Sequence, residues 1–435
     1  MGLKISKNEF MVYIMVLLSI IPLYIRIGGM KGQNILILAI GGLLFVTRKK
    51  MNYVSFKDGW PLYIWVFVRI FIYIYHGDLM GGISFFNRIM IALLVVINCI
   101  RSQNDFERGI DCLIGVSLIV SLLGLVEVGT GLNVFMLLNN SGEEIALNVS
   151  RLGRSRIIGF TQQSITYGLY MSMVTFLTIY RLNNKVSKKK KYIFKCILLL
   201  QITNILLAMS RAVIICFIAC LIFVLMKYSK LKGMLYLLVC LLILCIIALF
   251  WKDSYLGQYI YMMLALLFPK MKSVLPIGAL AEHANGIGDR FDLIAWVWET
   301  VGSNCLLGMG EKAEFAYRHL YSWEGTSFYT TKRMIEVYPL HLLFHYGFLG
   351  MISECLMYII FALKSYRSQF KYNLDYEGKI NFNCMVFVIL VLNFACWLAV
   401  MQAAEDITLY LIIFMTFVYN KFGREKVRLE KRGDM

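Results

Sequence analysis

Charged side chains are scarce in this sequence: Asp, Glu, Lys and Arg together make up 16% of the 435 residues. A soluble globular domain carries roughly 25% charged and 45–50% apolar residues. Here 59% of the residues are apolar and the mean hydropathy is +0.69. The scarcity of charge excludes an ordinary soluble protein and indicates a polytopic membrane protein.

Metal-binding and disulfide patterns are lacking too. The chain has 11 cysteines but no CxxC pair and no Cys/His cluster. All of them except Cys305 lie in or beside apolar runs, where a thiol behaves as a small hydrophobic side chain. Cys305 falls in a hydrophilic segment without a partner cysteine. The sequence therefore predicts neither a disulfide framework nor a metal site.

Apolar runs recur along the whole chain, and the first is not followed by a small-residue cleavage site, so we interpret it as a span and not as a cleaved signal. Each run approaches the roughly 20 residues that a helix needs to cross a bilayer. The runs lie near 10–28, 33–47, 60–76, 83–100, 109–129, 162–180, 192–209, 212–227, 234–251, 338–363, 382–401 and 405–420. The predicted fold is all-α, a polytopic integral membrane protein of about 12 transmembrane helices in one membrane-embedded domain, 1–435.

Positive charge is distributed unevenly between the loops. More than half of the 44 Lys and Arg residues fall in the termini and in alternate loops, which share one side of the membrane. The positive-inside rule makes that side cytoplasmic, so both termini and the KKKK segment at 188–191 are predicted to face the cytoplasm. The net charge of +18 then reflects topology and attraction to anionic lipid, and nucleic-acid binding is the poorer interpretation.

Two outer loops stand out by their length, 130–161 and 252–337, the second between spans 9 and 10. Loops beyond about 15 residues are usually functional or disordered. The longer one contains LGQYIYMMLALLF at 256–268 and FDLIAWVWETV at 291–301, with apolar residues at helical spacing. We expect this loop to be folded, with re-entrant or interfacial helices.

Arginines gather on the outer side, where the positive-inside rule makes them least expected. Arg211 begins the eighth span in LLAMSRAVIICF at 206–217, and Arg154, Arg156 and Arg290 lie in the outer loops. Few acidic residues stand next to them, so the pattern suits a polyanionic ligand such as a diphosphate. Other arginines are interpreted as interfacial anchors or members of structural ion pairs: Arg26, Arg69, Arg88 and Arg151.

Four segments follow one another in the second part of the chain: GFTQQSITYGLYM at 159–171, LLAMSRAVIICF at 206–217, GIGDRFDLIAWVWETVGSNCLLGMG at 286–310 and IEVYPLHLLFHYGFLG at 335–350. In this order they resemble the signatures of O-antigen and capsular polysaccharide polymerases of the Wzy type, which form one membrane glycosyltransferase superfamily with the O-antigen ligases. The resemblance covers roughly the last 280 residues of the chain.

The resemblance implies roles for particular residues. Ser210 and Arg211 match the family's serine-arginine corner, and Arg290 matches the arginine that opens the helix of the large outer loop. Gly308 and Gly310 match its Gly-x-Gly turn. Both arginines, with Arg154 and Arg156 of the earlier loop, become candidates to hold the diphosphate of a polyprenyl-linked oligosaccharide.

The resemblance leaves two candidates for the catalytic base. Ligases carry a His-Asn pair eleven residues before a glycine, and many polymerases carry Asp or Glu there. Counting back from Gly347 reaches Glu336, and His341 follows five residues later, with Tyr338 between them as a further substrate-binding candidate. This departure from the ligase pattern favours a polymerase, and it leaves both Glu336 and His341 as candidate catalytic bases.

The implied function is polymerisation of undecaprenyl-diphosphate-linked repeat units into O-antigen or capsular polysaccharide at the outer face of the bacterial cytoplasmic membrane. The lipid-linked oligosaccharide would be donor and acceptor, chain-length regulator and flippase proteins would be partners, and no cofactor or metal is required. An O-antigen ligase is one alternative. A flippase or transporter is another, although no repeated halves are seen and Glu405 and Asp406 are its best supporting feature.

Overall fold

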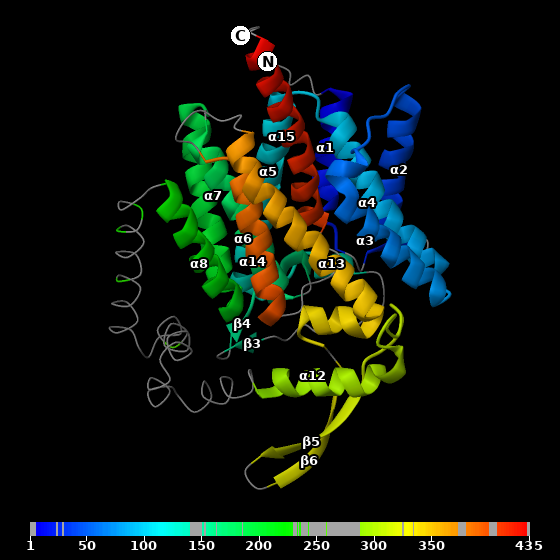
Figure 1. Cartoon of the computed structure of the whole chain (residues 1–435). Helices are drawn as coiled ribbons and strands as arrows, with labels where there is room; N and C mark the ends of the chain where they lie inside the picture. Colours follow the sequence, from blue (N-terminus) through cyan, green and yellow to red (C-terminus); the bar gives the residue numbers. More distant parts are fainter. Residues whose placement is uncertain are drawn as a thin grey trace.

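The structure is a computed structural model of the whole chain (Figure 1). It describes residues 6–22, 25–27, 30–139, 150–151, 154–161, 163–184, 186–228, 288–323, 326–333, 335–372, 380–399 and 407–432, together with four single residues between 233 and 258.

Helices dominate this part of the chain. They are α1 (Lys7–Leu18), α2 (Gly32–Thr47), α3 (Phe56–Tyr75), α4 (Leu79–Cys99), α5 (Gln103–Thr130), α6 (Ser164–Asn183), α7 (Lys188–Leu207), α8 (Arg211–Tyr228), α12 (Gly288–Val301), α13 (Tyr338–Lys371), α14 (Phe382–Ala399) and α15 (Ile407–Arg432). Among the described residues each expected span overlaps one of these helices. The ninth expected span, 234–251, lies outside them apart from two single residues. The first helix is shorter than expected, because α1 ends at Leu18, whereas Arg26 and Ile27 of the apolar run near 10–28 form the strand β1 (Arg26–Ile27).

The helix ends follow local capping signals. Ser6 with Glu9 and Ser102 with Asp105 form capping boxes that begin α1 and α5, so each serine oxygen accepts from a backbone N–H that the helix leaves unpaired. Gly131, with φ 74°, ends α5 in the left-handed conformation that glycine adopts without steric cost.

The surface of the bundle is that of a membrane protein. Among the described helices α4, α5, α8 and α13 are long and apolar enough to cross a bilayer, and α2 and Phe382–Trp397 are shorter apolar helices. Large apolar side chains such as Phe67 in α3 and Leu199 in α7 stand outward at mid-helix, 71% and 68% exposed. Such faces suit lipid and not water. The protein is an all-α polytopic membrane protein.

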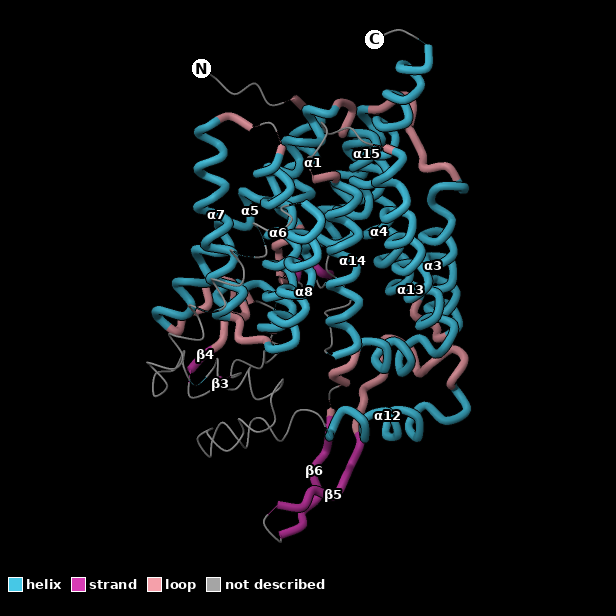
Figure 2. Tube along the Cα trace, turned by 60° about the vertical axis from the view of Figure 1, so that its left-hand side comes forward, coloured by secondary structure: helices cyan, strands magenta, loops and turns pink. Residues whose placement is uncertain are grey.

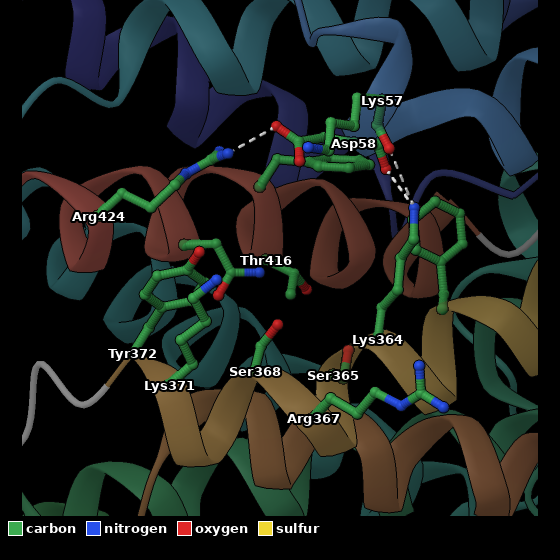
Figure 3. A pocket seen from close by; sticks show the side chains of 13 residues that line it. Lys57, Asp58, Lys364, Ser365, Arg367, Ser368, Lys371, Tyr372, Thr416 and Arg424 are labelled. Carbon is green, nitrogen blue, oxygen red and sulfur yellow. Dashed lines mark hydrogen bonds and ion pairs between the residues drawn. The ribbon is translucent and has the colours of Figure 1, made fainter.

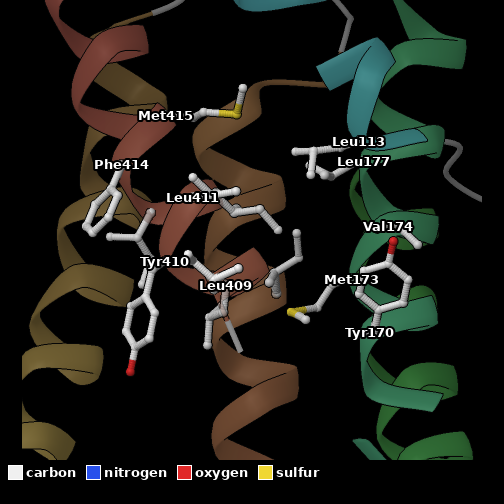
Figure 4. Close-up of a cluster of buried hydrophobic side chains, with 14 of the residues drawn as sticks. Leu113, Tyr170, Met173, Val174, Leu177, Leu409, Tyr410, Leu411, Phe414 and Met415 are labelled. Atoms are coloured by element: carbon white, nitrogen blue, oxygen red, sulfur yellow. The ribbon is translucent and has the colours of Figure 1, made fainter. Parts of the chain in front are cut away.

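The core lies where α14 and α15 pack beside α5 and α6 (Figure 4). Leu411 and Phe414 of α15 and Met173 and Leu177 of α6 are almost completely buried there. Close packing of this kind holds helices together in a bilayer, where burial from water contributes little between helices.

The two chain ends lie at the same end of the bundle (Figure 2). Ion pairs join helix ends there: Glu9 near the start of α1 pairs with Arg108 near the start of α5, and Arg181 near the end of α6 and Lys190 near the start of α7 both pair with Asp111 of α5. The consecutive helices α5, α6 and α7 therefore alternate in direction, as the sequence predicts. The assignment of this end to the cytoplasm stays a prediction.

The opposite end carries α12 and three small antiparallel hairpins (Figure 1). These are β1 (Arg26–Ile27) with β2 (Met30–Lys31), β3 (Ser150–Arg151) with β4 (Arg154–Ser155), and β5 (Tyr317–Trp323) with β6 (Thr326–Lys332). The helix expected over 291–301 is confirmed as α12, whereas 256–268 lies outside the described residues apart from Gln258.

The β5–β6 hairpin was not expected from the sequence. It is attached to α12, because the Tyr317 hydroxyl donates to Glu299 Oε2 at 2.7 Å and the Tyr317 ring stacks on Trp296 with centroids 5.2 Å apart. The described part of the long loop, from residue 288 on, is thus folded, partly as helix and partly as strand.

Candidate functional site

A break divides α13 close to its start. Gly347 has φ 63° and ψ −171°, a conformation that is essentially restricted to glycine, so the helix stops and restarts there. A Cβ at this position would lie 2.3 Å from the carbonyl oxygen of Leu306. The residues from Tyr338 to Tyr346 therefore form a short helix of their own, distinct from the long segment that follows.

Residues 305–310, near the end of the long loop, form backbone hydrogen bonds with the residues on both sides of the break. Backbone N–H groups of Met309 and Gly310 donate to the carbonyls of Phe344 and His345, at 2.8 and 3.0 Å. In return Phe348 donates to Cys305 at 2.8 Å. The carbonyls of Phe344 and His345 and the N–H of Phe348, which the broken helix leaves free, gain their hydrogen-bond partners in this way. The Gly-x-Gly turn is therefore the piece that holds the short helix in place.

Gly308 makes this approach possible. Its φ is 74°, and a Cβ there would lie 2.5 Å from the backbone nitrogen of Gly347. Two glycines almost forty residues apart thus meet, and neither tolerates a side chain. Sequence reasoning singled out both glycines, but it did not predict that they touch.

Three histidines gather around this junction. The rings of His341 and His345, one turn apart on the short helix, have centroids 4.3 Å apart. His345 Nδ1 donates to the carbonyl of Gly310 at 2.9 Å, and His76 Nε2 donates to that of Leu307 at 3.2 Å, since a carbonyl can only accept. The bond from Nδ1 of His345 places the proton on that nitrogen, so Nε2 of a neutral His345 ring is an acceptor. Sequence reasoning missed His76 and His345, although the i, i+4 spacing of the second from His341 was visible.

Tyr338 and Glu336 occupy the entry to the short helix. Tyr338 is 2% exposed, and its ring stacks near His341, with centroids 6.2 Å apart. Its hydroxyl donates to Glu354 Oε1 at 2.6 Å. Glu336 precedes the N-cap, Val337, and is partly exposed. The structure thus brings Tyr338 and His341 together, with Tyr338 acting as a core contact beneath the histidine.

A buried ion pair supports the short helix from below. Arg69 of α3 and Glu354 of α13 are 2% and 0% exposed, with Nη2 and Oε2 3.1 Å apart. Trp65 Nε1 also donates to Glu354 Oε2, at 3.1 Å. The Arg69 guanidinium lies 3.2 Å from the ring centroid of Tyr346, so a cation–π contact joins it to the short helix. The interpretation of Arg69 as an ion-pair member is confirmed, whereas Glu354 was missed.

The serine-arginine corner lies at the same end of the bundle. α7 ends at Leu207, Met209 takes a left-handed φ of 50°, and α8 begins at Arg211. Arg156 is buried and its Nε donates to the carbonyl of Ala208 at 3.0 Å. An arginine at the first residue of a helix adds positive charge to the positive end of the helix dipole, which favours an anion nearby.

Glu127 holds the loop that presents Arg156. Its carboxylate accepts from the backbone N–H groups of Ile158 and Gly159, at 3.1 and 3.0 Å, and from Asn133 Nδ2 at 3.2 Å. Sequence reasoning did not identify this residue. Of the other expected arginines, Arg154 lies on β4 and Arg290 in the first turn of α12, and their side chains are outside the described part of the structure.

α14 lies between the corner and the broken helix. The Cys220 thiol of α8 donates to the carbonyl of Val388 in α14 at 3.9 Å, and Trp397 of α14 packs on Tyr338 with ring centroids 4.8 Å apart. The arginine corner and the histidine helix are therefore two groups on one end of one packed unit. Among the described residues no group of His, Cys, Asp and Glu side chains could hold a metal ion.

This arrangement defines a polytopic membrane protein whose arginine corner and histidine helix lie at the same end of the bundle, the end that carries α12. Residues 196–353 match the model of a protein family described as O-antigen ligase. The match runs from α7 through the arginine corner and the loop to the short helix, and it supports the superfamily of O-antigen ligases and polymerases without separating the two. No curated protein matches the sequence.

Proposed function

We propose that the protein is a membrane glycosyltransferase that joins polyprenyl-diphosphate-linked oligosaccharide repeat units into O-antigen or capsular polysaccharide. The observation that carries the proposal is that an arginine corner and candidate bases lie at the same end of the bundle. Arg211 and His341 both fall within the segment similar to O-antigen ligases. The Ser210–Arg211 corner supplies charge, and the His341 helix supplies proton acceptors.

The reaction assigns a task to each group. An acceptor sugar hydroxyl attacks the anomeric carbon of the donor, the carbon–oxygen bond to the diphosphate breaks, and the lipid diphosphate leaves with the electron pair. Arg156 and Arg211, joined by Arg154 and Arg290, would stabilise the leaving diphosphate, at about 1.5–3 kcal/mol per charged hydrogen bond. His341 or Glu336 would take the hydroxyl proton. His345, with Nε2 open as an acceptor, becomes a third candidate.

Polymerase is preferred over ligase because Glu336 stands where ligases carry a His-Asn pair. The family match itself supports a ligase equally well. A ligase would transfer the finished glycan to a different acceptor, and a flippase would move it without forming a bond. Undecaprenyl diphosphate as carrier, a site at the outer face of the cytoplasmic membrane, and chain-length regulator and flippase partners belong to the same proposal.

Reconstitution in proteoliposomes with a defined lipid-linked repeat unit tests these choices. Lengthening of the glycan on the lipid, followed by gel electrophoresis, is the expected result. Transfer only when a second, unlike acceptor is added would identify a ligase. Translocation of the lipid-linked unit without new glycosidic bonds would overturn the glycosyltransferase proposal.

A further inference from the structure

A pocket of about 490 Å³ opens at the end of the bundle that carries the termini, at the opposite end of α13 from the proposed active site (Figure 3). It lies between the start of α3, the last turns of α13 and the part of α15 from Thr416 to Arg424. Its charged lining residues are five cations and one carboxylate: Lys57, Lys364, Arg367, Lys371, Arg424 and Asp58.

The one carboxylate of the lining is already engaged. Arg424 Nη1 lies 2.9 Å from Asp58 Oδ2, and Lys364 Nζ donates to the backbone carbonyl of Asp58 at 2.9 Å. Partial burial raises the pKa of Asp58, but the hydrogen bond and charge of Arg424 outweigh this and hold the pKa below its ordinary value. Asp58 is therefore ionised at neutral pH and neutralises a single lining cation.

Within the described residues Arg367 and Lys371 form no ion pair, and both are exposed one turn apart on α13. Ser365 and Ser368 add hydroxyl groups to the pocket wall, whereas the Thr416 hydroxyl donates to the carbonyl of Ile412 at 3.1 Å. Guanidinium, ammonium and hydroxyl donors converging on one cavity form the donor set that binds a phosphate group.

Apolar surface continues from the rim of the pocket. Phe370 is 71% exposed and Leu363 48% exposed on the same turns of α13, and these faces suit contact with acyl chains. Exposed aromatic rings next to lysines and arginines are typical of the boundary between hydrocarbon and head groups. A soluble phosphate would use only the cations, whereas a phospholipid would use both the cations and the apolar rim.

We infer that this pocket binds the phosphate head group of an anionic phospholipid from the leaflet that surrounds this end of the bundle. Basic pockets between transmembrane helices recognise such head groups through charge and donor geometry together. The bound lipid would tie α3, α13 and α15 together, because each contributes lining residues. This inference does not depend on the glycosyltransferase proposal.

The test uses the full-length protein in detergent and measures retained phosphatidylglycerol by native mass spectrometry, with phosphatidylcholine as the neutral comparison. The double variant Arg367→Gln, Lys371→Gln should weaken retention about thirtyfold, since each of the two phosphate contacts contributes about 1 kcal/mol. The matched control is Lys188→Gln, Lys189→Gln, which removes the same charge from exposed residues at the start of α7, outside the pocket. This control should retain the lipid as the unchanged protein does.

A variant of opposite sign separates binding from damage to the fold. Asp58→Asn removes the one lining carboxylate and frees Arg424, so it should tighten retention, whereas a loss of folding would weaken it. Equal retention by the pocket variant and its control would overturn the inference. Displacement of the lipid by inorganic phosphate at the same phosphate concentration would also overturn it, because the occupant would then be a soluble anion.

Discussion

The Tyr338 hydroxyl donates to Glu354 Oε1 at 2.6 Å, across the break in α13. The same carboxylate pairs with Arg69 of α3, so a single buried acid holds the first residue of the histidine helix and a helix from the first quarter of the chain. The orientation of His341 therefore depends on residues that lie below it in the core.

We expect Glu354→Gln to be strongly destabilising, because it leaves the Arg69 charge buried without a counter-ion. Breaking a buried pair costs about 3–5 kcal/mol. Thermal unfolding in detergent should show the loss. The control is the double variant Arg69→Met, Glu354→Leu, which removes both charges. Its unfolding temperature should be closer to that of the unchanged protein. A double variant as unstable as the single one would contradict this account.

Gly347→Ala should disrupt the junction between the loop and the short helix. Alanine avoids φ 63°, ψ −171°, and its Cβ would meet the Leu306 carbonyl at 2.3 Å. We expect lower expression or a reduced unfolding temperature, together with loss of polymer formation. Gly42→Ala is the matched control, because a Cβ on that helical glycine meets nothing within 4 Å. Equal tolerance of the two substitutions would show that the break is dispensable.

His341→Ala and Glu336→Gln, made separately, distinguish the candidate bases. The variant that removes the base should lower polymer formation by about 10²–10⁴-fold at normal protein level. His345→Gln belongs in the same series, because its Nε2 is open as an acceptor. The measurement is glycan length on the lipid carrier in proteoliposomes. Near-normal polymer from all three variants would remove this helix from the proton transfer.

Arg211→Lys should keep insertion and folding but lose most of the activity, because an ammonium cannot reproduce the bidentate fork that a diphosphate accepts. A membrane anchor would tolerate the change, since lysine snorkels about as well as arginine. Activity and donor binding are measured separately for Arg211→Lys and Arg211→Ala. Full activity with lysine would return Arg211 to an anchoring role, leaving Arg156, Arg154 and Arg290 to hold the charge.

Topology is tested by cysteine labelling in intact cells, in a background without reactive native cysteines. A cysteine at Lys189 should resist an impermeant reagent, because 188–191 is predicted to face the cytoplasm. A cysteine at Tyr329 on β6, 63% exposed at the opposite end, should react and serves as the control. The reverse pattern would invert the predicted orientation of the whole bundle.

Hydropathy alone determined the membrane class, the position of the described spans and the alternation of their ends, because the bilayer requires each crossing segment to be apolar and helical. The β5–β6 hairpin was not predicted although its two strands are neighbours in the sequence, and its contact with α12, from Tyr317 to Glu299, was decided by the tertiary structure.

The candidate site divides in the same way. His341, Arg211 and the glycines were visible as residues, because chemistry and conformational freedom belong to the residue type. The contact of Gly308 with Gly347, the bond from Arg156 to Ala208 and the pairing of Glu354 with Arg69 were decided by the tertiary structure alone. Each contact joins residues that are far apart in the sequence, so no local pattern predicts it. A buried charge or a glycine comes into contact with its partner only when the helices pack together.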